Sequence, residues 1–495
     1  MKGLKLSSAL VLVLSLALSS CGHDAVEDAD YSMYDRSLGT EYDPNSGDDY
    51  NEIIENEFIN TSDESVSTFS IDADGGSYSN VRSHLIEGYM PQANAVRIEE
   101  FLNYFDFDYP SPQGDDPLNI DLEMSSTPWN SESKLVRIGI KGKEVAKDEI
   151  PPANYVFLVD VSGSMGSSGK LSLVKYGLQR MVDALDEQDQ IGLVTYASNP
   201  RIVLEPTSCK NKSTIKNAIE ELTSGGSTNG EGGILNAYAL AEEHFIDGGN
   251  NRVILCTDGD FNVGLSSQNE LVDLIEEERE KGVFLTVIGV GHGNLQDGTM
   301  EQLANNGNGT YEYLDSEQQA RRVFVEKLSR MLAVAKDVKV QVEFNPNMVK
   351  AYRLIGYENR VLANEDFEDD TKDAGELGMG QCVTAMYEVI MQPQSAKKEW
   401  NLKFGFRYKN PNEESSELME RTFEGSIPTF GDASGELQFA ASLAAWGMLL
   451  RDSKYSGTAT YSEVRKWASN GLDFDPDGAR SEFMSLVSKS EDLDK

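Results

Sequence analysis

The chain has 495 residues, a formal net charge of −40 at pH 7, and hydrophobic and aromatic fractions of 39% and 9%. This length supports two or three domains with packed cores, so wholesale disorder is excluded. The excess of carboxylates repels phosphate backbones, which argues against nucleic acid as a partner.

Residues 1–21 have the features of a secretory signal peptide. Lys2 and Lys5 provide a basic start, and an apolar run from Leu6 to Leu18 follows. The run is too short for a membrane-spanning helix, and its flanking residues are typical of a secretory signal peptide. The small residues Ser19 and Ser20 directly before Cys21 resemble a bacterial lipobox.

This resemblance implies that Cys21 is lipidated and anchors the protein in the bacterial cell envelope. Glycine at position 22, where an aspartate would act as a sorting signal, favours the outer membrane. An ordinary signal peptide with an incidental cysteine is the alternative.

Residues 22–65 are acidic and rich in Asp, Asn, Ser and Gly, and Arg36 is their lone basic residue. They show no sustained helical or strand period, so we predict a flexible tether. Order is expected to begin in an N-terminal α+β region, residues 66–152. Its predicted strands are 66–71, 118–124 and 134–143, and its predicted helices are 78–85 and 95–105.

The central region, residues 153–335, alternates apolar strand-like runs with segments of helical period. The predicted strands are 155–159, 191–196, 252–256 and 283–290. Such alternation is typical of an α/β fold with a doubly wound parallel sheet, which binds ligands outside the carboxyl ends of its strands. A β-rich C-terminal region with a helical tail is predicted for residues 336–495.

Three cysteines remain once Cys21 is assigned to the lipid. An odd number in an oxidising compartment excludes a complete disulfide framework. Cys256 lies in an apolar run and is predicted to be a buried core residue. A Cys209–Cys382 bridge is left open.

One motif carries chemistry. The predicted strand that ends at Val159 runs into Asp160-Val161-Ser162-Gly163-Ser164, which places a carboxylate and two hydroxyls at alternating positions. These hard oxygen ligands suit Mg²⁺, Mn²⁺ or Ca²⁺ and are unsuited to zinc. The pattern Asp-x-Ser-x-Ser is weak evidence alone; its position after a buried strand strengthens it only together with further residues elsewhere in the chain.

The motif resembles the metal-ion-dependent adhesion site of von Willebrand factor A domains. That family also has a threonine in a Gly-rich loop and an aspartate after a later strand, and Thr228 and Asp258 occur in matching contexts. The resemblance implies that Ser162, Ser164 and Thr228 bind one divalent cation directly, with Mg²⁺ favoured. It implies that Asp160 and Asp258 hold the ion largely through waters.

The flanking regions resemble those of YfbK-like bacterial lipoproteins. The N-terminal resemblance rests on the segments 67–72, 80–82, 96–100 and 103–105, and the C-terminal one on 353–360 and 373–376. The likeness therefore covers nearly the whole chain beyond the predicted tether.

Other motifs are weaker. Ser164 to Leu171 departs from a phosphate-binding loop at its first and last positions, which argues against a nucleotide. The segment from Asp473 resembles half of a calcium loop but has Met484 where a bidentate glutamate belongs. No histidine lies near Ser162 or Ser164 in sequence, which disfavours nucleophilic catalysis.

The resemblance favours a non-enzymatic, envelope-anchored module. We expect its metal ion to capture an Asp or Glu of an envelope or extracellular protein. A metal-assisted hydrolase is the alternative. A third hypothesis is a latch, in which a carboxylate between Glu41 and Glu64 of the acidic tether occupies the metal site.

Overall fold

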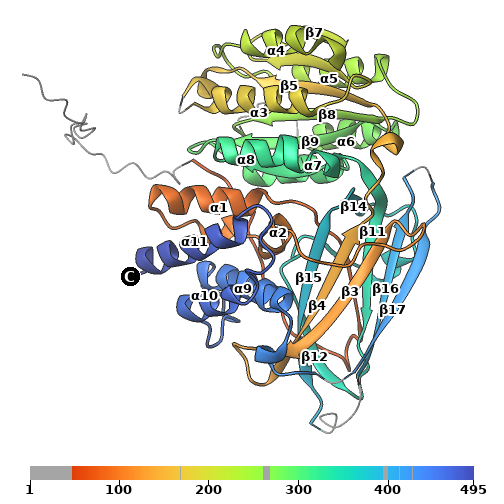
Figure 1. Cartoon of the computed structure of the whole chain (residues 1–495), viewed down its shortest axis with the longest axis vertical. Coiled ribbons are helices and arrows are strands. Elements are labelled where there is room, and N and C mark those ends of the chain that lie inside the picture. Colours follow the sequence, from red (N-terminus) through yellow and green to blue (C-terminus); the bar gives the residue numbers. More distant parts are fainter. Residues whose placement is uncertain (1–46, 168, 260–267, 394–399, 412, 426) are drawn as a thin grey trace, which may run out of the picture. The chain divides into compact units, whose positions relative to one another are not determined.

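The computed structural model describes residues 47–495 except 168, 260–267, 394–399, 412 and 426. The predicted signal peptide, Cys21 and residues 22–46 of the predicted tether therefore lie outside the described residues. The described residues form three sheets, one in an α/β domain and two that consist of antiparallel strands (Figure 1). No helix among the described residues is long and apolar enough to span a bilayer.

The α/β domain contains a six-stranded sheet in the order β10-β9-β8-β5-β6-β7. Neighbouring strands run parallel except for the pair β6–β7, which is antiparallel. The edge strands β7 and β10 were not predicted, because β7 is polar and partly exposed and β10 is very short. The strands are β5 (Ala153–Asp160), β6 (Gln190–Tyr196), β7 (Arg201–Ser208), β8 (Asn250–Thr257), β9 (Phe284–Val290) and β10 (Tyr311–Leu314).

Helices cover both faces of this sheet. Every residue of the central strand β5 is buried, and its side chains alternate between two cores. Phe157 and Val159 pack against α3, α4 and α8, whereas Val156 and Leu158 pack against α5, α6 and α7. The helices are α3 (Lys170–Ala184), α4 (Lys212–Glu220), α5 (Gly230–Glu243), α6 (Gln268–Glu280), α7 (Asp297–Asn306) and α8 (Glu317–Arg321).

The other two sheets share one hydrophobic core and form a β-sandwich. Their orders are β1-β12-β15-β4-β3 and β13-β2-β11-β16-β17, with β14 beside β11. The strands are β1 (Ile59–Asn60), β2 (Val66–Ser70), β3 (Leu118–Ser126), β4 (Ser133–Gly142), β11 (Ala333–Glu343), β12 (Val349–Ile355), β13 (Val361–Leu362), β14 (Gly375–Gly378), β15 (Cys382–Met391), β16 (Trp400–Lys409) and β17 (Glu417–Gly425).

A helical layer packs against the outer face of the first of these sheets. Its core includes Trp446 of α9 and Phe101 of α2, and Leu135 and Met386 reach it from β4 and β15. Figure 1 shows these helices grouped together. They are α1 (Gly76–Glu87), α2 (Ile98–Tyr104), α9 (Gly435–Leu450), α10 (Tyr461–Ser469) and α11 (Ala479–Leu493).

The two segments that flank the α/β domain form one structure. Strand β2 pairs with β11, and β4 pairs with β15, so each sheet of the sandwich combines strands from before and after the domain. The predicted fold class, with a central parallel sheet and a helical C-terminal tail, is confirmed. The shared sheets were not predicted, because strand pairing across a whole domain leaves no local signal in the sequence.

The prediction of a flexible tether over residues 22–65 is wrong for residues 47–65. Asp48 accepts hydrogen bonds from the backbone N–H groups of Gly293 and Leu295, at 2.7 and 2.8 Å. The short strand β1 pairs with β12, and Thr61 is buried. This acidic segment is ordered because its polar groups bond to the rest of the chain, which composition alone does not reveal.

The structure does not contain the Cys209–Cys382 bridge. Cys209, Cys256 and Cys382 are all free and buried. Cys209 lies in the core of the α/β domain, and Cys382 lies in the core beneath the helical layer. The prediction that Cys256 is a core residue is confirmed.

Buried ion pairs join the α/β domain to the flanking structure. Arg97, directly before α2, pairs with Asp297 and Glu301 of α7 and with Glu100 of α2. Arg82 of α1 pairs with Asp315, which follows β10, at 2.6 Å. Burying these charges is costly unless each partner is present. The pairs therefore favour the docked arrangement of the two parts.

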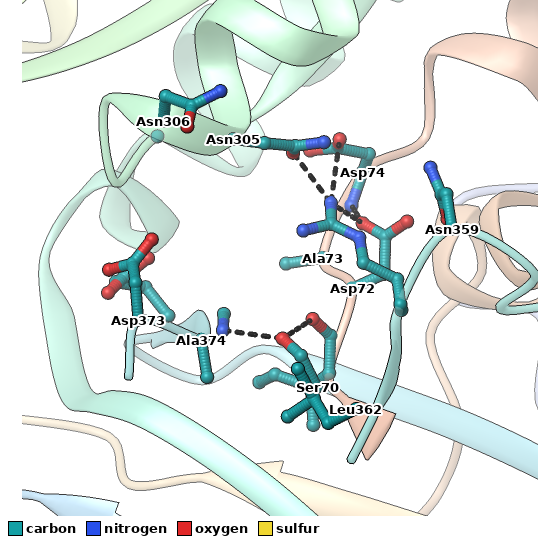
Figure 2. A pocket seen from close by; sticks show the side chains of 15 residues that line it. Ser70, Asp72, Ala73, Asp74, Asn305, Asn306, Asn359, Leu362, Asp373 and Ala374 are labelled. Carbon is teal, nitrogen blue, oxygen red and sulfur yellow. Dashed lines mark hydrogen bonds and ion pairs between the residues drawn. The ribbon is translucent and has the colours of Figure 1, made fainter. Parts of the chain in front are cut away.

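A polar pocket of about 160 Å³ lies at the same junction (Figure 2). Arg360 crosses it, pairing with Asp72 at 3.2 Å and donating a hydrogen bond to Asn305 Oδ1 at 2.6 Å. Asp74, which Figure 2 shows beside Asn305, accepts the backbone N–H of Tyr311 of β10 at 2.8 Å. The pocket is therefore part of the charged junction.

We predict that Arg97→Met lowers the free energy of unfolding by about 3–5 kcal/mol, because three buried carboxylates lose their cation. Urea denaturation of the purified chain would measure the loss. Lys147→Met is the matched control, since Lys147 pairs with Asp186 at an exposed site and should cost less than about 1 kcal/mol. Equal losses in the two variants would contradict a junction held by buried charge.

Candidate metal centre

The candidate site lies at the carboxyl edge of the α/β sheet. Strands β5 and β8 are parallel neighbours, with Val159 paired to Cys256. Asp160 is the last residue of β5, and Asp258 directly follows β8. The topology therefore brings together two aspartates that lie about a hundred positions apart in sequence, at the edge where such sheets bind ligands.

Asp160 is fully buried and fixes the loop that follows it. Its Oδ1 accepts the backbone N–H of Ser162 at 2.7 Å. Burial raises the pKa of Asp160 to about 6, and the charge of Asp258 adds to this shift, whereas hydrogen bonds from Ser162 oppose it. Two neighbouring buried carboxylates are electrostatically unfavourable unless cations neutralise them.

The two motif serines point their hydroxyls at each other. Ser162 Oγ and Ser164 Oγ are 2.9 Å apart, on a loop that continues into a 3₁₀ turn over Gly163–Gly166. Ser162 is buried and Ser164 is partly exposed, so the pair lies at the boundary between the domain core and solvent.

The loop that carries Thr228 is joined to the motif loop by two backbone hydrogen bonds. Gly163 N–H donates to Gly226 O at 3.0 Å, and Gly225 N–H donates to Val161 O at 2.8 Å. Gly226 has a φ of +91°, which favours glycine, and a Cβ there would lie 2.6 Å from Ser198 Oγ. Thr228, two residues further along, is partly exposed.

Asp258 is fully buried, and the structure shows a partner for its Oδ2. Its Oδ2 pairs with Lys170 Nζ at 3.0 Å. Its Oδ1 is buried and has no hydrogen-bond partner among the residues that the structure describes. A buried carboxylate oxygen without a donor is costly, and a cation or a metal-bound water would satisfy it.

Lys170 is the site residue that the sequence analysis missed. It begins α3, its side chain is 5% exposed, and its ammonium also donates to Asn294 Oδ1 at 3.1 Å. Its side chain lies against the backbone of Gly291, where a Cβ would come within 2.2 Å of Lys170 Cε. The only sequence signal was its place in the rejected phosphate-loop pattern, which gives no hint of Asp258.

Three acidic residues of the proposed latch segment lie elsewhere. Glu64 accepts a hydrogen bond from Asn364, and Glu57 pairs with Lys454. Glu55 lies 3.9 Å from Arg451. The latch hypothesis is therefore wrong for these three, and its acidic residues up to position 46 lie outside the described residues.

Family models match nearly the whole described chain. The model described as von Willebrand factor type A domain matches residues 154–327, and one described as von Willebrand factor matches residues 44–137. A model described as Uncharacterized protein YfbK, C-terminal, matches residues 329–405 and 392–493. None of the three is described as an enzyme, and type A domains are typically modules of protein–protein interaction.

Among curated proteins, the chain is 38% identical over 464 residues to the Uncharacterized protein YfbK of Escherichia coli (strain K12). That match covers 88% of this chain and 80% of the relative. The chain is also 26% identical over 212 residues to the human inter-alpha-trypsin inhibitor heavy chain H3, which covers 40% of this chain and 23% of that protein.

Among solved structures, the chain is similar to a von Willebrand factor type A protein from Catenulispora acidiphila. The identity is 14% and the TM-score 0.44, and the match covers 77% of this chain and 91% of the other. A second is the conserved hypothetical protein BatB from Bacteroides thetaiotaomicron, at 22% identity and a TM-score of 0.31, which covers 36% of this chain and 98% of that chain.

We predict that Lys170→Gln makes the α/β domain more dependent on divalent cations. Without them, the melting temperature should fall, because Asp258 becomes a buried charge without its partner. Mg²⁺ should then raise it more than in the wild type, because the ammonium no longer repels the ion. Thermal melts over a series of Mg²⁺ concentrations would show this.

Lys175→Gln is the matched control for this variant. Lys175 lies on the same helix and donates to the backbone oxygen of Glu220 at the surface, at 2.6 Å. An equal Mg²⁺-dependent rise in the wild type and in Lys170→Gln would show that Lys170 has no electrostatic influence on the site.

Proposed function

Because the chain belongs to the YfbK family and carries a von Willebrand factor type A domain between two flanking segments, we propose that it is a metal-dependent protein-binding module. The observation that carries the proposal is the meeting of Asp160, Ser162, Ser164 and Asp258 at one edge of the sheet. Thr228 lies on the loop bonded to the motif loop and would complete the set.

The donor set fits a hard divalent cation. All the groups are carboxylate or hydroxyl oxygens, which Mg²⁺, Mn²⁺ and Ca²⁺ prefer. An octahedral Mg²⁺ with oxygens at about 2.0–2.1 Å holds neighbouring ligands about 2.9 Å apart. The Ser162 and Ser164 hydroxyl oxygens have this separation. This spacing is compatible with Mg²⁺, which the resemblance to type A domains favours.

Charge explains how such a site recognises a partner. When bound, the cation supplies a strong positive charge that attracts a carboxylate. Neutral hydroxyls would contact it directly, and Lys170 already neutralises part of Asp258. The cation therefore keeps a net positive field towards solvent, where Ser164 and Thr228 are partly exposed. An Asp or Glu of an envelope or extracellular protein is the partner that this field selects.

We place this activity at the bacterial cell envelope, with a lipid on Cys21 as the anchor and the outer membrane as the favoured membrane. The support is the lipobox-like sequence before Cys21. Residues 22–46 would then link the anchor to the folded part of the chain.

The hydrolase alternative gains no support. The nearest buried cation, Lys170, is engaged by Asp258 and Asn294. A general base would need to lie within hydrogen-bond reach of a metal-bound water. We assign the acidic residues Asp160 and Asp258 to the ion itself, so neither is left to act as that base.

The first test is cation binding. We expect the EDTA-treated chain to bind one equivalent of Mg²⁺ in calorimetric titration, and Asp160→Ala and Ser162→Ala to lose it. Asp186→Ala, at an exposed surface position, should bind as the wild type does. Undiminished binding by Asp160→Ala would refute the assignment of the site.

The second test is partner capture. Crosslinking in native envelopes should give an adduct that disappears with EDTA, returns with Mg²⁺ and is absent for Asp160→Ala. An adduct that is insensitive both to EDTA and to Asp160→Ala would show that recognition does not use the metal.

A further inference from the structure

Asp48, His84 and His292 form a compact cluster outside the candidate metal centre. One ligand-type atom from each residue lies within 4.8 Å of the others. Asp48 lies in the segment before β1, His84 lies on α1, and His292 follows β9. Two of the four histidines in the chain thus meet, although they lie far apart in sequence.

Asp48 presents its Oδ2 to this cluster. Its Oδ1 is occupied by the N–H groups of Gly293 and Leu295. Its Oδ2 is buried, without a hydrogen-bond partner in the described part of the chain, and lies 3.6 Å from His292 Nδ1.

His84 is held in the tautomer that metal ligands require. Its Nδ1 is 2.9 Å from the backbone oxygen of Asn80, which can only accept, so Nδ1 carries the hydrogen. Nε2 of the neutral ring is then an unshared lone pair. It is buried and unpaired within the described residues, and the residue is 1% exposed. Metal-ligating histidines almost always donate their other ring N–H to a carboxylate, a backbone carbonyl or a water, as His84 does here.

His292 has the complementary arrangement. Its Nε2 lies 2.8 Å from Ser83 Oγ and 3.0 Å from the Tyr313 hydroxyl, both of which can accept its hydrogen. Its Nδ1 then faces Asp48 Oδ2 at 3.6 Å and also lies 3.3 Å from the Tyr313 hydroxyl. The rings of His84 and His292 are 4.4 Å apart.

We propose that Asp48, His84 and His292 form a second metal site, which binds a first-row transition-metal dication such as Zn²⁺. Two imidazole nitrogens and one carboxylate oxygen are a ligand set typical of zinc and are poorly suited to Mg²⁺ or Ca²⁺. The ligands are His84 Nε2, His292 Nδ1 and Asp48 Oδ2. This proposal does not rest on the proposed function, because the site shares no residue with the oxygen-ligand centre.

The ion clamps three segments of the chain together. It joins the segment around Asp48 to α1 and to the loop 291–296 of the α/β domain. It also satisfies two buried atoms, Asp48 Oδ2 and His84 Nε2, that otherwise destabilise the fold.

The test is Zn²⁺ titration of the full chain, purified without a polyhistidine tag and stripped with EDTA, against a zinc-binding dye in excess Mg²⁺. We expect one equivalent of tightly bound Zn²⁺. His84→Gln and Asp48→Asn should weaken it by at least about 100-fold, since even an outer-shell change can cost this much. His244→Gln, a histidine outside the cluster, should not.

Two further measurements keep the result decisive. Asp160→Ala should retain the Zn²⁺ equivalent, which separates this proposal from the Mg²⁺ site. Co²⁺ should give a visible absorption band that His292→Gln abolishes, and this variant serves if the buried His84→Gln does not fold. Absence of a stoichiometric Zn²⁺ site in the wild type, or unchanged affinity in the ligand variants that fold, overturns the proposal.

Discussion

Buried charge at the junction between the α/β domain and the flanking structure is the constraint on which the rest depends. Arg82 and Arg97 are buried, Arg360 is partly buried, and each finds a carboxylate or polar partner across the junction. A guanidinium in such a place is tolerable only when its partners are present. These pairs therefore specify one docked arrangement, whereas non-directional apolar contacts alone would specify it less strictly.

The same arrangement links the two proposed metal centres through one short loop. Asp48 holds the backbone N–H groups on both sides of Asn294, and the Asn294 side chain accepts a hydrogen bond from Lys170. Lys170 in turn pairs with Asp258. The segment around Asp48 thus contacts the loop whose Asn294 holds the Lys170 ammonium next to the oxygen-ligand site.

Local patterns in the sequence predicted what is local in the structure. The central strand of the α/β domain, the motif after it and the alternation with helices depend on neighbouring residues, and the structure contains them. Asp258 was assigned through the resemblance to type A domains, which have an aspartate after a later strand. Lys170 and the pair His84–His292 were missed, because their partners come from segments whose proximity only the folded chain defines. The order of residues 47–65 was missed for the same reason.

The shared sandwich also constrains the order in which the molecule can assemble. Strand β2 must find β11, and the whole α/β domain lies between them in the chain. Closing so long a loop while it is unfolded costs conformational entropy, and the cost rises with loop length. If the domain forms first, its own strands carry Ala153 and the start of β11 to fixed positions and shorten the effective loop. Residues 66–142 then lack their sheet partners until the domain and β11 have formed, so their apolar strand edges stay unpaired through the earlier stages of folding.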